Sequence, residues 1–167
     1  MLENYKKHVA ERAEQNIPPL PLDADQTSEL VELLKKDHQE SDFLLNLLKE
    51  RVPAGVDQAA YVKAAFLADI TTDKASSPYI TKIDAVKILG TMLGGYNIQP
   101  LIECLKNNEL AETAAHVLSR TLLIFDAFNE IFELSKTNEY AKKVVEEWAN
   151  ATWFTEKTDI EEQIKLT

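Results

Sequence analysis

Apolar residues recur at spacings of three and four along almost the whole chain, and this periodicity restricts the fold more than any other feature of the sequence. At the amino terminus, the apolar side chains that fall on one side of an α-helix are Leu2, Tyr5, Val9 and Ala13. Before the last few residues, no segment shows the alternation of apolar and polar side chains that marks a half-buried strand. The sequence therefore predicts an all-α protein.

Residues that cap or break helices divide this pattern into separate elements. Asn16 can adopt the left-handed conformation after a first helix, and the prolines between Pro18 and Pro21 stop that helix from continuing. Later helices are expected to start at side chains that accept hydrogen bonds from backbone amides: Asp23, Ser41, Asp57 and Thr81. Thr81 and Asp84 also match the pattern of a capping box.

The most apolar stretch runs from Leu110 to Leu134. Its apolar side chains cover too much of the circumference for a helix that lies on the surface. We therefore expect one central, buried helix there, with Phe125, Phe128 and Phe132 in the core. After it, the spacing predicts another helix that contains Trp148.

Short helices that follow one another in pairs are typical of α-solenoids such as HEAT arrays, whose repeat is about 40 residues long. We expect residues 1–157 to form a HEAT-like helical domain, an array of antiparallel helix pairs. An irregular compact bundle would show the same periodicity and is the alternative. Thr158 and Glu161 form a second capping-box pattern, so residues 158–167 are expected to hold a last short helix and a linker.

The composition argues against several classes of function. The 167 residues carry a formal net charge of −10, and the lysines and arginines are spread singly along the sequence. Such a surface repels phosphate backbones, so we expect no direct binding of nucleic acid. No apolar run approaches the ~20 residues that span a bilayer, which predicts no membrane contact and a cytoplasmic location. The single cysteine, Cys104, cannot form an internal disulfide.

Three of the four glycines lie close together in LGTMLGGYNIQPLI, residues 89–102. This segment follows a predicted helix, whereas phosphate-binding loops and dinucleotide-binding turns follow a strand, so we interpret it as a helix junction. Gly94 and Gly95 are expected to supply positive φ angles. Asn97 is expected to accept hydrogen bonds from the first turn of the next helix, and Gly90 to permit close helix packing.

The remaining polar residues form no recognisable catalytic constellation. His8, His38 and His116 are far apart and lack the paired spacing of metal ligands, so we expect no metal site. Cys104 and His116 could meet as a nucleophile and a base, but no third group would orient them, and we favour a buried structural role for the cysteine. On physical grounds the chain is best interpreted as a protein-interaction module.

Four segments of the chain resemble the start of the bacterial aconitase B family. They are LENYKKHVAERAEQNIPPLPLDADQTSELVELLK, RVPAGVDQAAYVKAAFLADI, ILGTMLGGYNIQPLI and NEYAKKVVEEWANATWF. The resemblance implies the amino-terminal HEAT-like domain of a multidomain aconitate hydratase. Such a lyase interconverts citrate and isocitrate through cis-aconitate, can hydrate 2-methyl-cis-aconitate, and uses a [4Fe-4S] cluster held by three cysteines in its carboxyl-terminal half. No catalytic, cofactor-binding or metal-binding residue of the family falls on this chain.

The resemblance also implies partners. The domain is expected to form homodimers, to shape a passage to the active site, and to contact the other domains of its parent and other enzymes of the citric acid cycle. The parent is expected to bind messenger RNA under the control of this domain. As contact residues we name Tyr96 and Asn97, at the corner after the glycines, and Trp153 near the carboxyl end. The concave side of the helix array is the alternative contact surface.

Two other interpretations stay open. An independent HEAT-like adaptor protein with no enzymatic parent would explain the same helical pattern. A small enzyme that uses Cys104 and His116 would need a thiol with a lowered pKa. The alternating residues from Ile164 to Thr167 resemble the start of a strand, which is expected for a chain cut at the boundary with the family's swivel domain.

Overall fold

The computed structural model describes residues 1–121 and 125–151, and every regular element in these residues is helical. The prediction of an all-α protein is confirmed. The elements are α1 (Leu2–Glu14), α2 (Ala24–Leu34), α3 (Ser41–Asn46), the π-helical turn η1 (Leu47–Arg51), α4 (Gln58–Thr71), α5 (Lys82–Leu89), α6 (Ile98–Cys104), α7 (Ala111–Leu118), α8 (Phe125–Ser135) and α9 (Glu139–Ala149). None of these helices is long and apolar enough to span a membrane.

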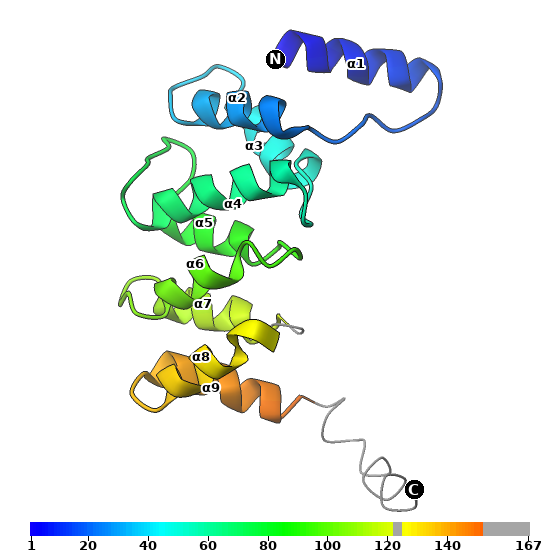
Figure 1. The fold of residues 1–167 in the computed structure, drawn as a ribbon. Coiled ribbons are helices and arrows are strands. Elements are labelled where there is room, and N and C mark those ends of the chain that lie inside the picture. Colours follow the sequence, from blue (N-terminus) through cyan, green and yellow to red (C-terminus); the bar gives the residue numbers. More distant parts are fainter. Residues whose placement is uncertain (122–124, 152–167) are drawn as a thin grey trace, which may run out of the picture.

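The helices stack in sequence order into an elongated array, with α1 at one end and α8 and α9 at the other (Figure 1). Each helix packs mainly on helices near it in the sequence: α2 on α4, α4 on α5, α5 on α7, and α7 on α9. Packing between near neighbours in sequence is the defining property of a solenoid-like array. The structure is thus an array of helices rather than a compact bundle, and the HEAT-like assignment stays a prediction.

Asp23, Asp57 and Thr81 cap the helices at which the sequence predicts them. Asp57 accepts a hydrogen bond from the amide of Ala60 at 3.0 Å, and Thr81 forms a reciprocal capping box with Asp84. Asn16 adopts the predicted left-handed conformation, with φ of 54°. The prediction for Ser41 is wrong, because this residue is the first of α3 and makes no capping hydrogen bond.

A set of polar contacts around one aromatic ring attaches α1 to the rest of the array. Tyr5 is 3 % exposed. Its hydroxyl donates to the carbonyl of Leu20 at 3.1 Å and accepts from Nε of Arg51 at 3.1 Å. Nε2 of His8 accepts a hydrogen bond from the amide of Leu20 at 3.0 Å, so this histidine has a structural role. These contacts hold the linker between α1 and α2 against α1.

The core consists mainly of leucine, isoleucine, valine and alanine side chains from successive helices. The fully buried side chains include Leu30, Leu34, Leu44, Leu48, Leu67, Leu89, Leu101, Ile102 and Leu118. Gly90, at the end of α5, lies so close to α7 that a Cβ atom added to it would be 2.7 Å from Cβ of Val117. The prediction that Gly90 permits close helix packing is confirmed.

The single buried helix predicted between Leu110 and Leu134 is wrong, because α7 ends at Leu118 and α8 starts at Phe125. The hydroxyl of Ser119 donates to the carbonyl of His116 at 3.1 Å, and the hydroxyl of Thr121 donates to the carbonyl of Val117 at 3.0 Å. Such side-chain bonds to carbonyls three or four residues earlier compete with the backbone pattern of a helix. The periodicity of the apolar residues contains no sign of this break.

The break changes the environment of the phenylalanines that we expected in the core. Phe128 and Phe132 are each 44 % exposed, so their prediction as core residues is wrong. Among the side chains of α8 that the structure describes, the buried one is Ile131, which is 0 % exposed. The side chain of Phe125 lies outside the described part of the structure.

One charged side chain lies inside the array. Lys63 of α4 is 1 % exposed and follows Ala59 and Ala60 on the buried side of the helix. Burial lowers the pKa of its ammonium from 10.5 to about 8, and the carboxylate of Glu50 partly opposes this effect. A buried ammonium without full compensation costs free energy of folding.

Replacing Gly90 by Ala is expected to destabilise the protein by about 1–3 kcal/mol, because the new methyl group would overlap Val117 across two helices. Urea unfolding followed by circular dichroism measures this change. Gly55→Ala is the matched control, since its Cβ would meet nothing closer than Asp57 at 3.9 Å. Equal stability of the two variants would contradict the close contact.

Replacing Lys63 by Met is expected to stabilise the protein by about 1–3 kcal/mol at pH 7, since it removes the buried charge. The folded state binds fewer protons than the unfolded state between about pH 8 and pH 10.5, so in the wild type this group's contribution to stability rises through that window. Unfolding free energies of both proteins across this range test the prediction. The advantage of Lys63→Met should shrink as the pH rises; a constant difference would contradict it.

Candidate functional site

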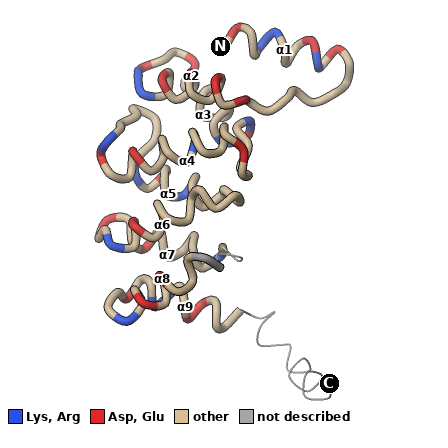
Figure 2. Tube along the Cα trace, in the orientation of Figure 1, with Lys and Arg blue, Asp and Glu red and all other residues tan. Residues whose placement is uncertain are grey.

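The loops between helices lie along two edges of the array, and the two edges differ in charge. On one edge, residues 52–56 and 90–97 carry no charged side chain (Figure 2). On the other edge, the loops around Asp73 and Glu109 carry both acids and lysines (Figure 2). Among the described residues, the uncharged loops form the best candidate for a contact with another protein surface.

The two uncharged loops are joined through their backbones. The amide of Leu93 donates to the carbonyl of Ala54 at 2.8 Å, and the hydroxyl of Tyr96 donates to the carbonyl of Val56 at 2.9 Å. A Cβ on Gly94 would lie 1.9 Å from the carbonyl oxygen of Gly55. The missing side chain of Gly94 thus allows the segment before α4 to touch the loop after α5.

The roles of the clustered glycines differ from the expectation in one respect. Gly95 has a φ of 89°, as predicted for a turn that needs glycine. Gly94 does not have a positive φ, and that part of the prediction is wrong. What Gly94 needs is space, because the backbone of Gly55 occupies the position of its missing side chain.

Asn97 holds the loop from inside. It is 1 % exposed, and its Nδ2 donates to the carbonyls of Leu89 at 2.8 Å and Met92 at 3.1 Å. Its side chain makes no capping bond to α6, so the predicted capping role is wrong. The last carbonyls of a helix have no backbone amide of the same helix to accept from, and the amide group of Asn97 supplies donors at the end of α5.

Apolar side chains of these two loops and of α4 are exposed to solvent. Leu93 is 87 % exposed, Val56 73 % and Tyr61 55 %. The ring of Tyr61 meets the half-buried ring of Tyr96 edge to face, with 5.4 Å between the centroids. We name this surface the corner patch and define it as Val56, Tyr61, Leu93 and Tyr96.

Sequence reasoning found only part of this surface. It named Tyr96, which lies in the corner patch, and Asn97, which lies beneath it. It missed Leu93, Val56 and Tyr61, although residues 88–102 contain no charged side chain and place a leucine within a turn. The available signal was Leu93, an apolar residue next to two glycines in a loop, where an exposed apolar side chain indicates a contact surface. Trp153 lies outside the described residues.

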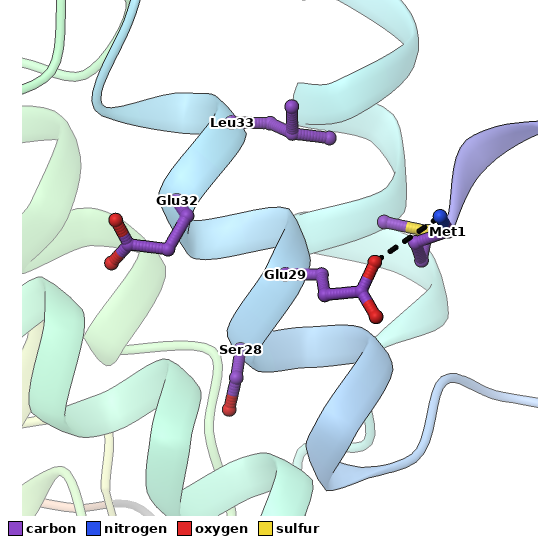
Figure 3. A pocket seen from close by; sticks show the side chains of 5 residues that line it. All are labelled: Met1, Ser28, Glu29, Glu32 and Leu33. Atoms are coloured by element: carbon purple, nitrogen blue, oxygen red, sulfur yellow. Dashed lines mark ion pairs between the residues drawn. The ribbon is translucent and has the colours of Figure 1, made fainter.

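A groove of about 430 Å³ lies between the start of α1 and α2. Its lining residues are Met1, Ser28, Glu29, Glu32 and Leu33 (Figure 3). The amino group of Met1 pairs with Glu29 at 3.1 Å. Lys35 pairs with Glu32 at 2.6 Å and lowers the pKa of that carboxyl through the hydrogen bond. The carboxylates of the groove therefore already have cationic partners.

The structure does not bring Cys104 and His116 together as a reactive pair. Cys104 of α6 is 4 % exposed, and burial raises the pKa of its thiol, opposite to what a nucleophile needs. His116 instead lines an open cleft of about 160 Å³ between α7 and α9, with Tyr140 and Lys143 among its neighbours. The geometry gives no support to an enzyme built on this pair.

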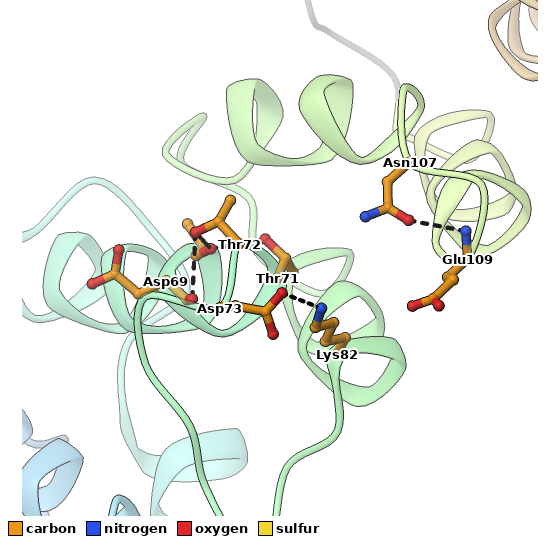
Figure 4. Close-up of polar contacts among 8 residues, drawn as sticks. Asp69, Thr71, Thr72, Asp73, Lys82, Asn107 and Glu109 are labelled. Atoms are coloured by element: carbon orange, nitrogen blue, oxygen red, sulfur yellow. Dashed lines mark hydrogen bonds and ion pairs between the residues drawn. The ribbon is translucent and has the colours of Figure 1, made fainter.

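The charged edge of the array is held together by its own contacts (Figure 4). Lys82 pairs with Asp73 at 2.5 Å, and the side chain of Asn107 accepts a hydrogen bond from the amide of Glu109 at 2.9 Å. Asp73 adopts a left-handed conformation with φ of 60° after α4. In the described ranges, no group of three or more His, Cys, Asp or Glu side chains is arranged to hold a metal ion.

Comparison with known proteins decides the family. The family model described as the aconitate B N-terminal domain matches residues 4–154. The chain belongs to this family. Over its whole length it is 54 % identical to aconitate hydratase B of Escherichia coli and 52 % identical to that of Synechocystis sp.. Over 98 % of its length it is 47 % identical to aconitate hydratase B of Helicobacter pylori.

The chain spans about a fifth of the length of these curated relatives, 20 % in each of the three. It therefore corresponds to the N-terminal domain of aconitate hydratase B and not to the whole enzyme. The helical array, the corner patch and the buried cysteine are features of this N-terminal domain.

The [4Fe-4S] cluster expected for aconitases does not fit the residues of this domain. Cysteine thiolates hold such clusters, and the chain contains one cysteine. That cysteine, Cys104, is buried in the core and carries a thiol whose pKa burial raises. The N-terminal domain of this aconitase B member thus offers no set of cluster ligands.

Replacing Gly94 by Ala is expected to separate the two loops of the corner patch, because the methyl group would overlap the backbone of Gly55. The amide of Leu93 should then exchange with solvent at least ~10-fold faster, which corresponds to about 1.4 kcal/mol of lost protection. Hydrogen exchange followed by NMR measures it. Gly95→Asn is the control, since asparagine tolerates a positive φ and nothing lies within 4 Å of the added Cβ.

Proposed function

We propose that this chain serves as the N-terminal interaction domain of a [4Fe-4S] aconitate hydratase, and that two copies of the parent associate through it. The parent would interconvert citrate and isocitrate through cis-aconitate in the cytoplasm. The observation that carries the proposal is the corner patch, an exposed apolar surface on a domain whose relatives are named aconitate hydratase B.

Electrostatics supports self-association at this place. Each copy carries a formal net charge of −10, so two copies repel one another over most of their surfaces. Residues 88–102 carry no charge, and Leu93 and Val56 are the most exposed large apolar side chains among the described residues. Contact at the corner patch removes apolar surface from water while keeping the charged edges apart.

The acidic charge also bears on nucleic acid. We propose that the domain controls RNA binding by its parent through association and does not hold the RNA itself, since its field repels phosphates. We also propose other enzymes of the citric acid cycle as partners that could bind an exposed apolar surface such as the corner patch. An independent adaptor protein is the competing proposal, and it differs in requiring no enzymatic parent.

The mass of the native protein distinguishes these two proposals. An antibody against this domain should detect, in the source cells, a polypeptide about five times heavier than the 18.9 kDa of this chain, because the relatives are about five times longer. The purified native protein should also hydrate cis-aconitate. A native band at 18.9 kDa would exclude the enzymatic parent and favour the adaptor.

Replacing Leu93 by Asp is expected to raise the dissociation constant for self-association at least ~10-fold, about 1.4 kcal/mol, since each patch would carry a new charge facing its copy. Sedimentation over a range of concentrations measures the constant, for the chain alone and for the parent.

Ile83→Asp is the matched control. Ile83 is 43 % exposed, lies in the first turn of α5 near the charged edge, and can accept an acid there without loss of helix stability. Tyr96→Ala tests the aromatic half of the corner patch. Unchanged association of both corner variants, with the fold intact, would remove this surface from the proposal.

A further inference from the structure

The linker between α1 and α2 is held against the array mainly by hydrogen bonds. We name residues 17–22, IPPLPL, the strap, which connects the two helices in Figure 1. Ile17 is 38 % exposed and Leu20 is 54 % exposed, so neither side chain gains much from burial. Leu22, at the end of the strap, is buried. The position of the strap before Leu22 therefore depends on polar contacts.

One peptide group of the strap is bound at both of its ends. It joins Pro19 to Leu20. Its carbonyl accepts a hydrogen bond from Nη2 of Arg51, and its N–H donates to Nε2 of His8 at 3.0 Å. A guanidinium at the oxygen and a lone pair at the N–H both match the dipole of the peptide group. Since an imidazole nitrogen accepts a hydrogen bond only while it carries no proton, His8 is neutral in this arrangement.

Protonation of His8 would remove one of these two contacts. An imidazolium has an N–H at both ring nitrogens and no acceptor, so the N–H of Leu20 would lose its partner and face a positive charge. Both ends of the peptide group would then meet a cation. Histidine is the side chain whose charge ordinarily changes between pH 5 and pH 8, so mild acidification is sufficient for such a change.

Two arginines lie around the same contact. From η1, Arg51 also donates to the hydroxyl of Tyr5, and the ring of Tyr5 lies 6.0 Å from the imidazole of His8, centroid to centroid. On α1, Arg12 follows His8 by one turn and donates from Nε to the carbonyl of Pro18 at 2.8 Å. A proton on His8 would therefore add a third positive charge to this region, and like charges repel.

The other charged groups near His8 offset one another. Lys7 and Glu11 of α1 form a pair at 3.7 Å on positions next to it. The strap itself has no charged side chain. The hydrogen bond from Leu20 and the two arginines thus dominate the surroundings of the imidazole.

The contact with Leu20 also bears on how α1 is held. Tyr5 is the buried residue of α1, and its hydroxyl donates to the carbonyl of Leu20 at 3.1 Å. Release of Leu20 would therefore remove a partner of Tyr5 as well, and the strap and α1 are expected to open together. Exposed ion pairs contribute little to stability, and those that join α1 to the array are Met1 with Glu29 and Lys6 with Glu40.

We propose that His8 is a pH-sensitive latch for the strap and α1. Unprotonated, it binds the N–H of Leu20 and keeps Tyr5 and Leu22 covered, at 3 % and 1 % exposed. Protonated, it releases the strap and lets both side chains reach solvent. The closed arrangement binds one proton fewer than the open one, so a fall in pH shifts the population toward the open arrangement. All groups involved lie within this domain, so the inference goes beyond the proposed function and does not require the enzymatic parent.

His38 is a second titratable group that bears on α1. Its Nδ1 accepts a hydrogen bond from the amide of Glu40 at 3.1 Å, and the carboxylate of Glu40 pairs with Lys6 at 2.6 Å. The carboxylate of Asp37 precedes it in the same loop. Any response of α1 to pH therefore has to be assigned to His8 or to His38 by substitution.

Hydrogen exchange followed by NMR on the 167-residue chain tests the latch. The protection factor of the Leu20 amide, corrected for the intrinsic exchange rate at each pH, is expected to fall at least ~10-fold between about pH 7.5 and about pH 5.5. The amide of Leu93, which donates to the carbonyl of Ala54 at 2.8 Å, should keep its protection. Equal protection of Leu20 at both pH values would overturn the proposal.

Three matched variants assign the response. In His8→Gln the side-chain oxygen can accept the same hydrogen bond but does not titrate, so the protection of Leu20 should be equal at both pH values, whatever its level. His38→Gln and His116→Gln should keep the fall seen in the wild type. A fall that persists in His8→Gln, or one that disappears in His38→Gln, would overturn His8 as the latch.

The release of α1 has its own readout. Hydroxyl-radical oxidation of Tyr5 is expected to rise at least ~5-fold at the lower pH, relative to Tyr61 in the same sample, because the ring leaves its buried position. Tyr61 is 55 % exposed and corrects for the effect of pH on the radical dose. His8→Gln should show no rise. Unchanged oxidation of Tyr5 in the wild type would overturn the release of α1.

Discussion

Every helix of this protein must bury its apolar side against helices that are close to it in the sequence, and the rest of the structure depends on how closely those layers can approach. Small residues set that distance. Gly90 lets α5 rest on Val117 of α7, and Ala59 and Ala60 leave room on the buried side of α4. Since dispersion attraction falls steeply with separation, layers held apart by one methyl group would lose much of their contact energy.

The same constraint shapes the corner patch. The loop can touch the backbone of Gly55 only because Gly94 carries no side chain, and this contact fixes the loop after α5 against the segment before α4. Asn97 then ties the loop to the end of α5 from inside. With its backbone fixed in this way, the loop presents Leu93 to solvent without needing Leu93 for its own packing. A surface of this kind is free to serve a partner.

Local signals in the sequence predicted local structure. The capping box of Thr81 and the left-handed Asn16 follow from hydrogen bonds and sterics within a few residues, so they could be read directly. The break after Leu118 could not, because apolar spacing is similar on both sides of it.

Burial was harder to predict than helix boundaries. Lys63 sits three and four residues from Ala60 and Ala59 on one side of α4, and this spacing was the only sign that a charged side chain lies inside. The sequence likewise did not show which residues of the corner are exposed. The apolar Leu93 lies in solvent and the polar Asn97 is buried, the reverse of what their polarity suggests. Tertiary contacts decide such cases.

The buried Cys104 has a consequence for the chemistry of oxidation. Peroxides react with thiolates that solvent can reach, and this thiol is both enclosed by α6 and its neighbours and shifted toward its protonated form. The chain has no second cysteine with which it could form an internal disulfide. In the folded array, oxidation of this thiol therefore requires a local opening around α6 that exposes it to solvent.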